Sequence, residues 1–197
     1  MITLGLTGKT GAGKSTVANL LKEKDCYIID GDIIARQITE KGSEVLPLLQ
    51  KAFGDDILDD NGELIRAVLA KRAFSSKENT ALLNSITHPV IKQRCADEMA
   101  KAESLGYKTA LIDAAALLDS DCKDLCDKII VVTAPEDIRL QRILERDRIT
   151  KEQAMTRINA QKSDEYYFSH ADIIIRTYPP YDLQDEITKL EELISCK

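Results

Sequence analysis

One short stretch near the start of the sequence has residue types and spacing suited to binding phosphate. Residues 8–15 read GKTGAGKS and match the pattern GxxxxGK[ST] at every position. The glycines let the backbone curl tightly, so that successive N–H groups point inward at phosphate oxygens. Lys14 adds a positive charge for the β- and γ-phosphates, and the Ser15 hydroxyl can hold Mg²⁺. The pattern predicts a nucleoside triphosphate site whose phosphates contact Gly11, Ala12, Gly13, Lys14, Ser15 and Thr16.

The residues that flank this stretch are those that such a site requires. Residues 2–6 form an apolar run long enough for one buried strand, and residues 17–24 (VANLLKEK) begin an amphipathic helix. The positive end of that helix then faces the bound anion. A glycine-rich turn that binds nothing is the alternative, and the strand before the loop and the helix after it argue against that alternative.

Two carboxylates follow the second predicted strand, at residues 27–29. Asp30 and Asp32 stand on either side of Gly31. Ligands of open α/β sheets bind at the carboxyl ends of the strands, so two carboxylates beside a phosphate loop suit a general base and a contact to Mg²⁺ or water. Asp-Gly also favours a turn, and Asp32 could cap the following helix. Both interpretations stay open, because one Asp can cap the helix while the other acts in catalysis.

The middle of the chain, residues 33–108, has mostly helical patterns and no strong strand signal. Asn61-Gly62 predicts a turn, and Pro89 predicts a break in the helical pattern around it. His88 precedes that proline, and a local structural role fits it better than catalysis. A helical insertion after the second strand is where many small P-loop kinases carry their acceptor-binding parts.

Two further apolar runs are expected to be strands. Residues 109–113 (TALID) end in Asp113, which is where a carboxylate that holds Mg²⁺ through water is expected, although many strands end in Asp. Residues 127–135 give the strongest strand signal in the chain, and a helix opens at Glu136. The last strand and the last helix are expected at residues 171–176 and 183–194.

Basic residues recur along the helix that opens at Glu136. Arg139, Arg142 and Arg146 lie three and four positions apart, on one helical face. Such a stripe can be a solvated face paired with nearby carboxylates. Because this helix follows the strand expected beside the phosphate loop, we favour a lid whose arginines screen the transferring phosphoryl group.

Composition limits the class of protein and its partners. The 197 residues are 44% hydrophobic and 30% charged, as in a globular protein of one domain. A net charge of −6 argues against nucleic acid as the main partner. No apolar stretch has the length of a membrane span and no signal peptide is apparent, so we expect a cytoplasmic protein, monomeric or weakly homo-oligomeric. Free thiols rather than a zinc site are expected of Cys26, Cys95, Cys122, Cys126 and Cys196.

Strands and helices alternate at both ends of the chain, with the helical block between them. This order predicts an α/β fold with a parallel sheet, helices on both faces and the P-loop kinase architecture. We expect a single P-loop kinase domain of residues 1–197. Residues 33–105 form its helical acceptor-binding insertion, and residues 136–150 form its short lid.

Several stretches together resemble one family, the dephospho-CoA kinases, and occur in that family's order and spacing. They are TGKTGAGKST, IIDGDIIAR, HPVI, LIDAAALLDS, RILERDRITKEQAMTRINAQ and ADIII, and they cover nearly the whole chain. Many families share the P-loop. The combination of Asp-x-Asp, His-Pro and the R-D…R-I-x-x-Q run is much more specific.

The resemblance implies an enzyme that transfers the γ-phosphoryl group of ATP to the 3′-hydroxyl of dephospho-CoA, giving CoA and ADP in the last step of CoA synthesis. On the matching positions, Asp32 resembles the carboxylate that takes or orients the hydroxyl proton, and Asp30 supports it or the metal. Arg139 and Arg142 resemble lid arginines. Two residues fall on acceptor-side positions of the family: Arg36 and His88.

The sequence departs from the family at two places. Where the family usually has Pro-Leu-Leu-x-Glu, this stretch runs from Ala115 to Asp119, with alanine in place of proline and aspartate in place of glutamate. Where the family commonly has Asn after ADIII, Arg176 and Thr177 follow. The first change bears on the acceptor side and the second on the surroundings of the nucleotide base.

Three other functions compete with this interpretation. A kinase for another small molecule has a similar architecture, and an acceptor screen separates the two. A nucleotide switch of the GTPase type would carry an Asn-Lys-x-Asp stretch, which this sequence lacks. A helper ATPase for nucleic acid is disfavoured by the acidic net charge.

Overall fold

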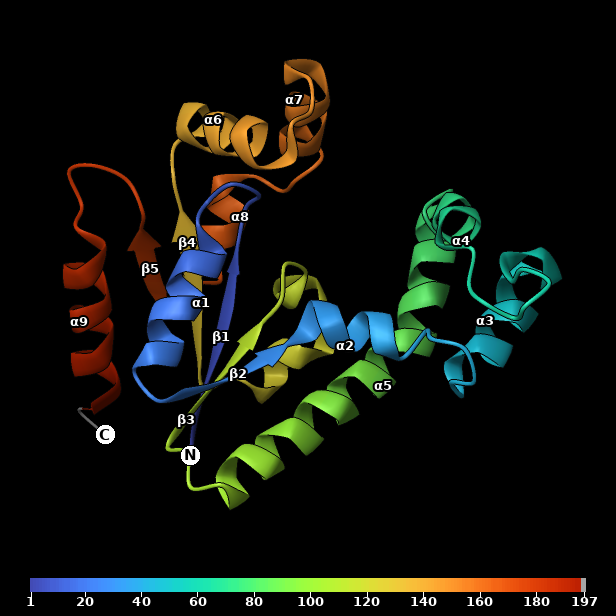
Figure 1. The fold of residues 1–197 in the computed structure, drawn as a ribbon, viewed down its shortest axis with the longest axis horizontal. Coiled ribbons are helices and arrows are strands. Elements are labelled where there is room, and N and C mark those ends of the chain that lie inside the picture. The colour runs from blue at the N-terminus through green and yellow to red at the C-terminus, as the bar shows by residue number, and fades with distance from the viewer. Residues whose placement is uncertain (196–197) are drawn as a thin grey trace.

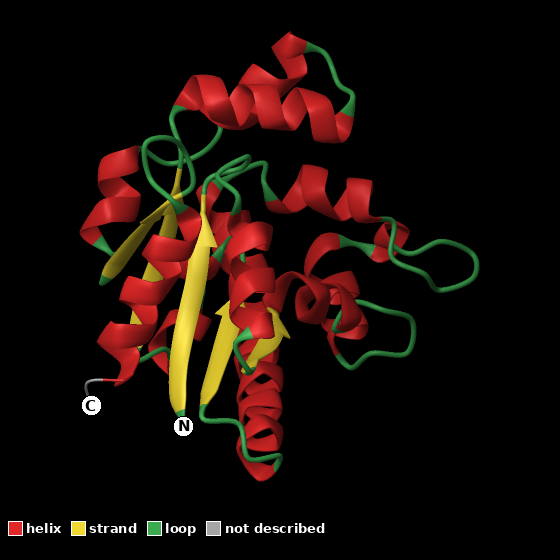
Figure 2. Ribbon diagram, turned by 60° about the vertical axis from the view of Figure 1, so that its left-hand side comes forward, coloured by secondary structure: helices red, strands yellow, loops and turns green. Residues whose placement is uncertain are grey.

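A parallel sheet of five strands forms the centre of the computed structural model, which describes residues 1–195. Figure 1 shows helices packed on both faces of this sheet, and Figure 2 shows the strands between them. The predicted α/β class is confirmed. The strand order is β2-β3-β1-β4-β5, with β1 at Ile2–Gly8, β2 at Cys26–Asp30, β3 at Thr109–Asp113, β4 at Lys128–Thr133 and β5 at Ile173–Arg176.

Alternation of side chains along the strands divides the core between the two faces of the sheet. One face carries Leu4, Leu6 and Leu111, which pack with helices α1 (Lys14–Glu23) and α9 (Leu183–Ser195). The other face carries Ala110 and Ile112, which pack with the helical insertion. Because both faces are covered, the strands read as nearly continuous apolar runs, which is why the sequence identified them.

The helical insertion lies beside the β2 edge of the sheet (Figure 1). Its core contains residues from each of its helices, among them Ile34, Leu49, Leu69 and Cys95. The predicted turn at Asn61-Gly62 is present, since the Asp59 carboxylate accepts the Asn61 N–H at 2.9 Å. The helices are α2 (Gly31–Gln37), α3 (Val45–Phe53), the 3-10 turn η1 (Asp55–Ile57), α4 (Arg66–Ala73) and α5 (Lys77–Ser104).

The predicted break near His88-Pro89 is wrong. Helix α5 runs without interruption through Pro89 over 28 residues. Proline removes one backbone hydrogen bond from a helix, a local cost that packing along the rest of the helix can outweigh. Helix α5 buries Thr87 and Cys95 on either side of Pro89, so both halves are held by tertiary contacts.

Two helices after β4 stand above the end of the sheet (Figure 1). Helices α6 (Glu136–Asp147) and α7 (Lys151–Asn159) pack on each other through Ile143, Ala154 and Ile158, a small core separate from the sheet. A short helix that the sequence did not reveal, α8 (Asp164–Ser169), connects α7 to β5. Among the described residues, no helix is both long and apolar enough to cross a membrane.

Candidate functional site

The loop between β1 and α1 forms the floor of a cavity of about 690 Å³. Gly11 and Gly13 have φ angles of 78° and 91°, a conformation that favours glycine, and Gly13 precedes the first turn of α1. All six residues expected to contact phosphates line the cavity. The other lining residues are Gly8, Lys9, Thr10, Asp32, Ala115, Arg142, Glu145, Arg146 and Gln161.

Two of the arginines of α6, Arg139 and Arg142, contact this loop. Arg142 donates to the Gly11 carbonyl at 3.3 Å, to the Thr177 hydroxyl at 3.0 Å and to the Thr177 carbonyl at 2.6 Å. Arg139 is 4% exposed and donates to the Thr10 carbonyl at 3.4 Å. Arg146 also lines the cavity, but its guanidinium is largely exposed and forms an ion pair with Asp147 at 2.7 Å. A wholly solvated stripe is therefore ruled out.

Arg139 and Arg142 hold different positions relative to the cavity. Arg142 lines it, whereas Arg139 is not among the lining residues and lies behind the loop, against the Thr10 carbonyl. The α6 backbone itself touches the loop, because a Cβ on Gly11 would lie 2.6 Å from the Arg139 carbonyl oxygen. Helix α6 therefore supports the loop and presents Arg142 and Arg146 to the cavity.

Two side chains far along the chain also hold the loop. Gln161 accepts the Thr10 N–H at 3.0 Å, and Thr177 donates its hydroxyl to the Ala12 carbonyl at 2.6 Å. Sequence reasoning did not assign either residue to the site. The R-I-x-x-Q run pointed at Gln161, and Thr177 was noted only as a departure from the family. Thr177 forms hydrogen bonds with the Ala12 carbonyl and with Arg142. The residue at this departure from the family therefore helps to hold the loop in place.

The two carboxylates after β2 have different positions: Asp30 caps the next helix, and Asp32 lines the cavity. Asp30 caps α2, because its carboxylate accepts the Ile33 N–H at 2.8 Å. The suggestion that Asp32 is the cap is wrong, since α2 begins at Gly31 and Asp32 lies in its first turn. Asp32 is exposed, lines the cavity and accepts the Ala115 N–H at 3.4 Å. Its carboxylate is thus available to a ligand.

Asp113, at the end of β3, forms an ion pair with Lys14. In the sheet register it lies opposite both Asp30 and Leu6. Burial raises the pKa of Asp113, the neighbouring Lys14 lowers it, and the charges of Asp30 and Asp32 raise it further. The loop lysine and three carboxylates therefore form one electrostatically coupled group.

Magnesium ligation by Ser15, Asp30 and Asp113 stays a prediction. The donor set fits Mg²⁺, which prefers oxygen ligands and keeps several waters. The Asp30 and Asp113 strands are neighbours, and Ser15 lines the cavity beside Lys14. Within residues 1–195, however, no three His, Cys, Asp or Glu side chains are placed to hold a metal by themselves.

His88 and Arg36 lie outside the lining of the cavity. His88 is half-buried, with Nδ1 4.0 Å from the Asp121 carboxylate, which agrees with a local structural role. Arg36 is exposed on α2, one helical turn beyond Asp32. The other departure from the family, Asp119, accepts the Tyr166 hydroxyl at 2.8 Å, and burial together with this carboxylate raises the pKa of Tyr166 to about 12.

Four of the cysteines lie in or next to the core as free thiols. The Sγ atoms of Cys95 and Cys122 are 3.7 Å apart, and Cys126 contacts the Cys122 carbonyl. Burial raises the pKa of the Cys26 thiol to about 12. Cys196 lies outside the described residues.

Comparison with known proteins gives a consistent result. A family model described as dephospho-CoA kinase matches residues 2–178. The dephospho-CoA kinase of Corynebacterium efficiens is 43% identical over 182 residues, which are 92% of this chain and 91% of that protein. Among solved structures, TT1252 from Thermus thermophilus has a TM-score of 0.80 at 25% identity, covering 98% of this chain and 96% of that one. The dephospho-CoA kinase of Campylobacter jejuni has a TM-score of 0.65 at 25% identity, with the same coverage.

Proposed function

The chain belongs to the dephospho-CoA kinase family, and from this premise we propose that it transfers the γ-phosphoryl group of ATP to the 3′-hydroxyl of the ribose of dephospho-CoA, giving CoA and ADP. One observation carries most of the proposal. The exposed Asp32 carboxylate and the phosphate loop line the same cavity, at the carboxyl ends of neighbouring parallel strands. A base and a phosphoryl donor need this proximity for in-line transfer.

The ATP phosphates bind to the loop in this proposal. Backbone N–H groups of residues 11–16 and the N-terminus of α1 face the β- and γ-phosphates. Lys14 is held near the cavity by Asp113, and it turns to the phosphates when they supply a stronger negative charge. Ser15, Asp30 and Asp113 would hold Mg²⁺, which would supply positive charge against the developing charge of the phosphates.

Asp32 takes or orients the proton of the acceptor hydroxyl. The Ala115 N–H contact at 3.4 Å fixes one carboxylate oxygen and leaves the other for the hydroxyl. Arg142 reaches the cavity and spreads the charge that develops on the transferring group, while Arg139 acts as a positioning residue behind the loop. Most of the catalysis then comes from positioning and charge stabilisation.

The remaining parts of the molecule complete the proposal. Residues 33–105 form the acceptor-binding insertion, with Arg36 on its α2 face toward Asp32, and His88 supports its fold. Residues 136–150 form the lid over the nucleotide. The net charge of −6 argues against a nucleic-acid partner, and we propose a cytoplasmic protein that is a monomer or weak homo-oligomer.

The test is ADP production from ATP and Mg²⁺, with and without dephospho-CoA. Turnover should require dephospho-CoA and should be lost in Lys14→Ala. Lys22→Ala is the matched control, because it removes the same charge from an exposed position on the same helix and should leave turnover unchanged. Intact ATP binding without stimulation by dephospho-CoA would refute the proposed acceptor and direct the search to other small molecules.

A further inference from the structure

Three cysteines lie together where helix α5 packs against the segment between β3 and β4. Cys95 is on α5, and Cys122 is 27 positions later, on the 3-10 turn η3 (Asp121–Leu125). Their Sγ atoms are 3.7 Å apart, and the Cys126 thiol donates to the Cys122 carbonyl at 3.5 Å. The proposed phosphoryl transfer uses none of these thiols. We call Cys95 and Cys122 the thiol pair.

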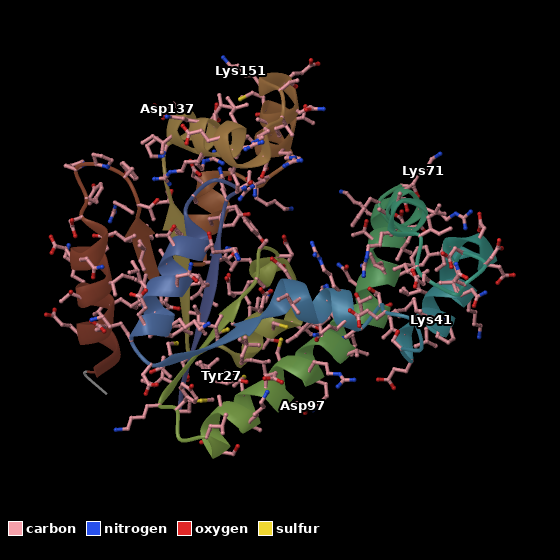
Figure 3. All side chains as sticks on the ribbon, in the orientation of Figure 1. Tyr27, Lys41, Lys71, Asp97, Asp137 and Lys151 are labelled. Atoms are coloured by element: carbon pink, nitrogen blue, oxygen red, sulfur yellow. The ribbon has the colours of Figure 1, made fainter. Side chains whose placement is uncertain are left out.

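Both members of the thiol pair are buried, but Cys122 lies close to the surface. Cys95 is 0% exposed and Cys122 is 3% exposed. Figure 3 shows Asp97 on the outer side of α5, and a helix turns by about 100° per residue, so Cys95 two positions earlier faces inward. Asp121 and Lys123, on either side of Cys122, are exposed. A small local opening of η3 therefore gives a small molecule access to Cys122.

The separation of the two sulfur atoms suits a disulfide. The S–S bond measures about 2.0 Å, so the sulfur atoms must approach by about 1.7 Å from their distance of 3.7 Å. One of the two elements can supply this movement, because the hydrogen bonds of a short 3-10 turn have poorer geometry than those of an α-helix. The disulfides that form in cytosolic proteins are usually transient and sense the redox state.

The two thiols differ in acidity, which assigns their roles. The pKa of Cys122 is lowered to about 7, chiefly by contact with the Cys95 thiol and against the opposing effect of burial. The Ser120 side chain and the charge of Lys92 also lower this pKa, whereas the charge of Asp121 raises it. Contact with Cys122, together with burial, raises the pKa of Cys95. Cys122 is therefore the thiolate near neutral pH, and a thiolate is the form that attacks an oxidant.

The thiol pair lies at a junction between two parts of the molecule. Helix α5 belongs to the helical insertion, whereas η3 leads into strand β4 of the sheet. Two charged contacts cross the same junction: Lys92 pairs with Asp124 at 3.1 Å, and Nδ1 of His88 lies 4.0 Å from the Asp121 carboxylate. Kinases commonly close lids or domains around their substrates. A covalent bond across this junction restricts movement of the insertion relative to the sheet.

We propose that Cys95 and Cys122 form a reversible disulfide when hydrogen peroxide reaches them, and that this bond slows turnover by fixing the insertion to the sheet. The Cys122 thiolate attacks one peroxide oxygen, the O–O bond breaks, and the departing hydroxide takes up a proton and leaves as water. The Cys95 sulfur then attacks the Cys122 sulfenic acid. The S–S bond forms, the S–O bond breaks, and the second hydroxide leaves as water with the Cys95 proton. Two thiols are oxidised and the peroxide is reduced to two waters.

Mass spectrometry tests the bond in a parent protein that carries Cys196→Ser, in which that cysteine cannot link two chains. Treatment with hydrogen peroxide should lower the intact mass by about 2 Da, the mass of the two hydrogens lost on disulfide formation. Trypsin cleaves after Lys123 and so separates Cys122 from Cys126. A digest without reductant should contain the Cys95 peptide joined to the Cys122 peptide. A bond through Cys126, added oxygen without a bond, or no reaction would overturn the proposal.

Substitutions of single cysteines in this parent protein supply the controls. Cys95→Ala should abolish the bond, and Cys122→Ala replaces it as the test if circular dichroism shows that Cys95→Ala does not fold. Cys26→Ala is the matched control, because Cys26 is equally a buried cysteine but packs in the core on the α1 side of the sheet. It should leave formation of the bond unchanged.

Turnover of ATP with dephospho-CoA tests the effect of the bond, and this part rests on the proposed function. The oxidised parent protein should lose kcat severalfold and regain it in dithiothreitol. Peroxide should leave kcat unchanged in Cys95→Ala and should lower it in Cys26→Ala as in the parent. An unchanged kcat in protein shown to carry the bond would overturn the effect on turnover. If the reduced protein does not use dephospho-CoA, the proposed function fails, and the mass measurements still decide whether the bond forms.

Discussion

Replacing Gly11 by alanine tests how helix α6 supports the phosphate loop. Gly11 has a φ of +78°, and a Cβ built on it lies 2.6 Å from the carbonyl oxygen and 3.0 Å from the Cα of Arg139. Both neighbours are backbone atoms of a helix, so no side-chain rotation relieves the contact. Either the loop or α6 must move. We expect Gly11→Ala to destabilise the protein and to weaken ATP binding.

Gly62→Ala is the control that separates the cost of the left-handed backbone angle from the cost of the contact with the α6 backbone. Gly62 has a nearly equal φ of +75°, but no atom lies within 4 Å of its added Cβ. The left-handed backbone alone should cost Gly62→Ala about 1–2 kcal/mol. Gly11→Ala carries the same cost plus about 1–3 kcal/mol for forcing atoms into a packed region, or about 2–5 kcal/mol in total.

Equilibrium urea unfolding of the two variants and the wild type measures the difference, with KM for ATP as the functional readout. Gly11→Ala should lose more stability than Gly62→Ala and should raise the KM for ATP about tenfold, whereas Gly62→Ala should leave it unchanged. Equal losses of stability with equal KM values would refute the idea that the α6 backbone sets the loop conformation.

Three further predictions concern the site itself. Asp32→Asn should lower kcat by about 10²-fold with little change in the KM for ATP, because a base lost from the transition state does not alter nucleotide binding. Arg142→Lys keeps the charge but loses the forked contacts to Gly11 and Thr177, so the KM for ATP should rise about tenfold in steady-state assays. Burial raises the pKa of Asp113 above its value in the unfolded chain, so its contribution to stability is present below the unfolded pKa, about 4, and is lost as pH rises through the folded pKa. The Tm of the wild type should therefore fall relative to the Tm of Asp113→Asn as pH rises from about 4 to 7.

Each of these predictions has a result that contradicts it. An unchanged kcat in Asp32→Asn would remove this carboxylate from the reaction. Wild-type kinetics in Arg142→Lys would mean that charge alone matters there and that the fork geometry does not. Parallel curves of Tm against pH for wild type and Asp113→Asn would show that Asp113 titrates alike in the folded and unfolded chains.

The sequence alone determined the phosphate loop, the α/β class and the resemblance to the dephospho-CoA kinases. The physical reason is that these features depend on short segments. The loop lies within eight consecutive residues, its glycines permit backbone angles that other residues rarely adopt, and the flanking strand and helix follow directly. The strands were found because a sheet covered on both faces needs nearly continuous apolar runs.

Tertiary structure decided which side chains meet at the site. Thr177 contacts Ala12 across 165 positions and Gln161 contacts Thr10 across 151, separations at which local patterns carry no signal. The choice between Asp30 and Asp32 as the cap depended on a helix start shifted by two residues. The continuity of α5 through Pro89 depended on packing along its length. Propensity and spacing define the elements, whereas burial and the competition for hydrogen-bond partners in three dimensions define the site.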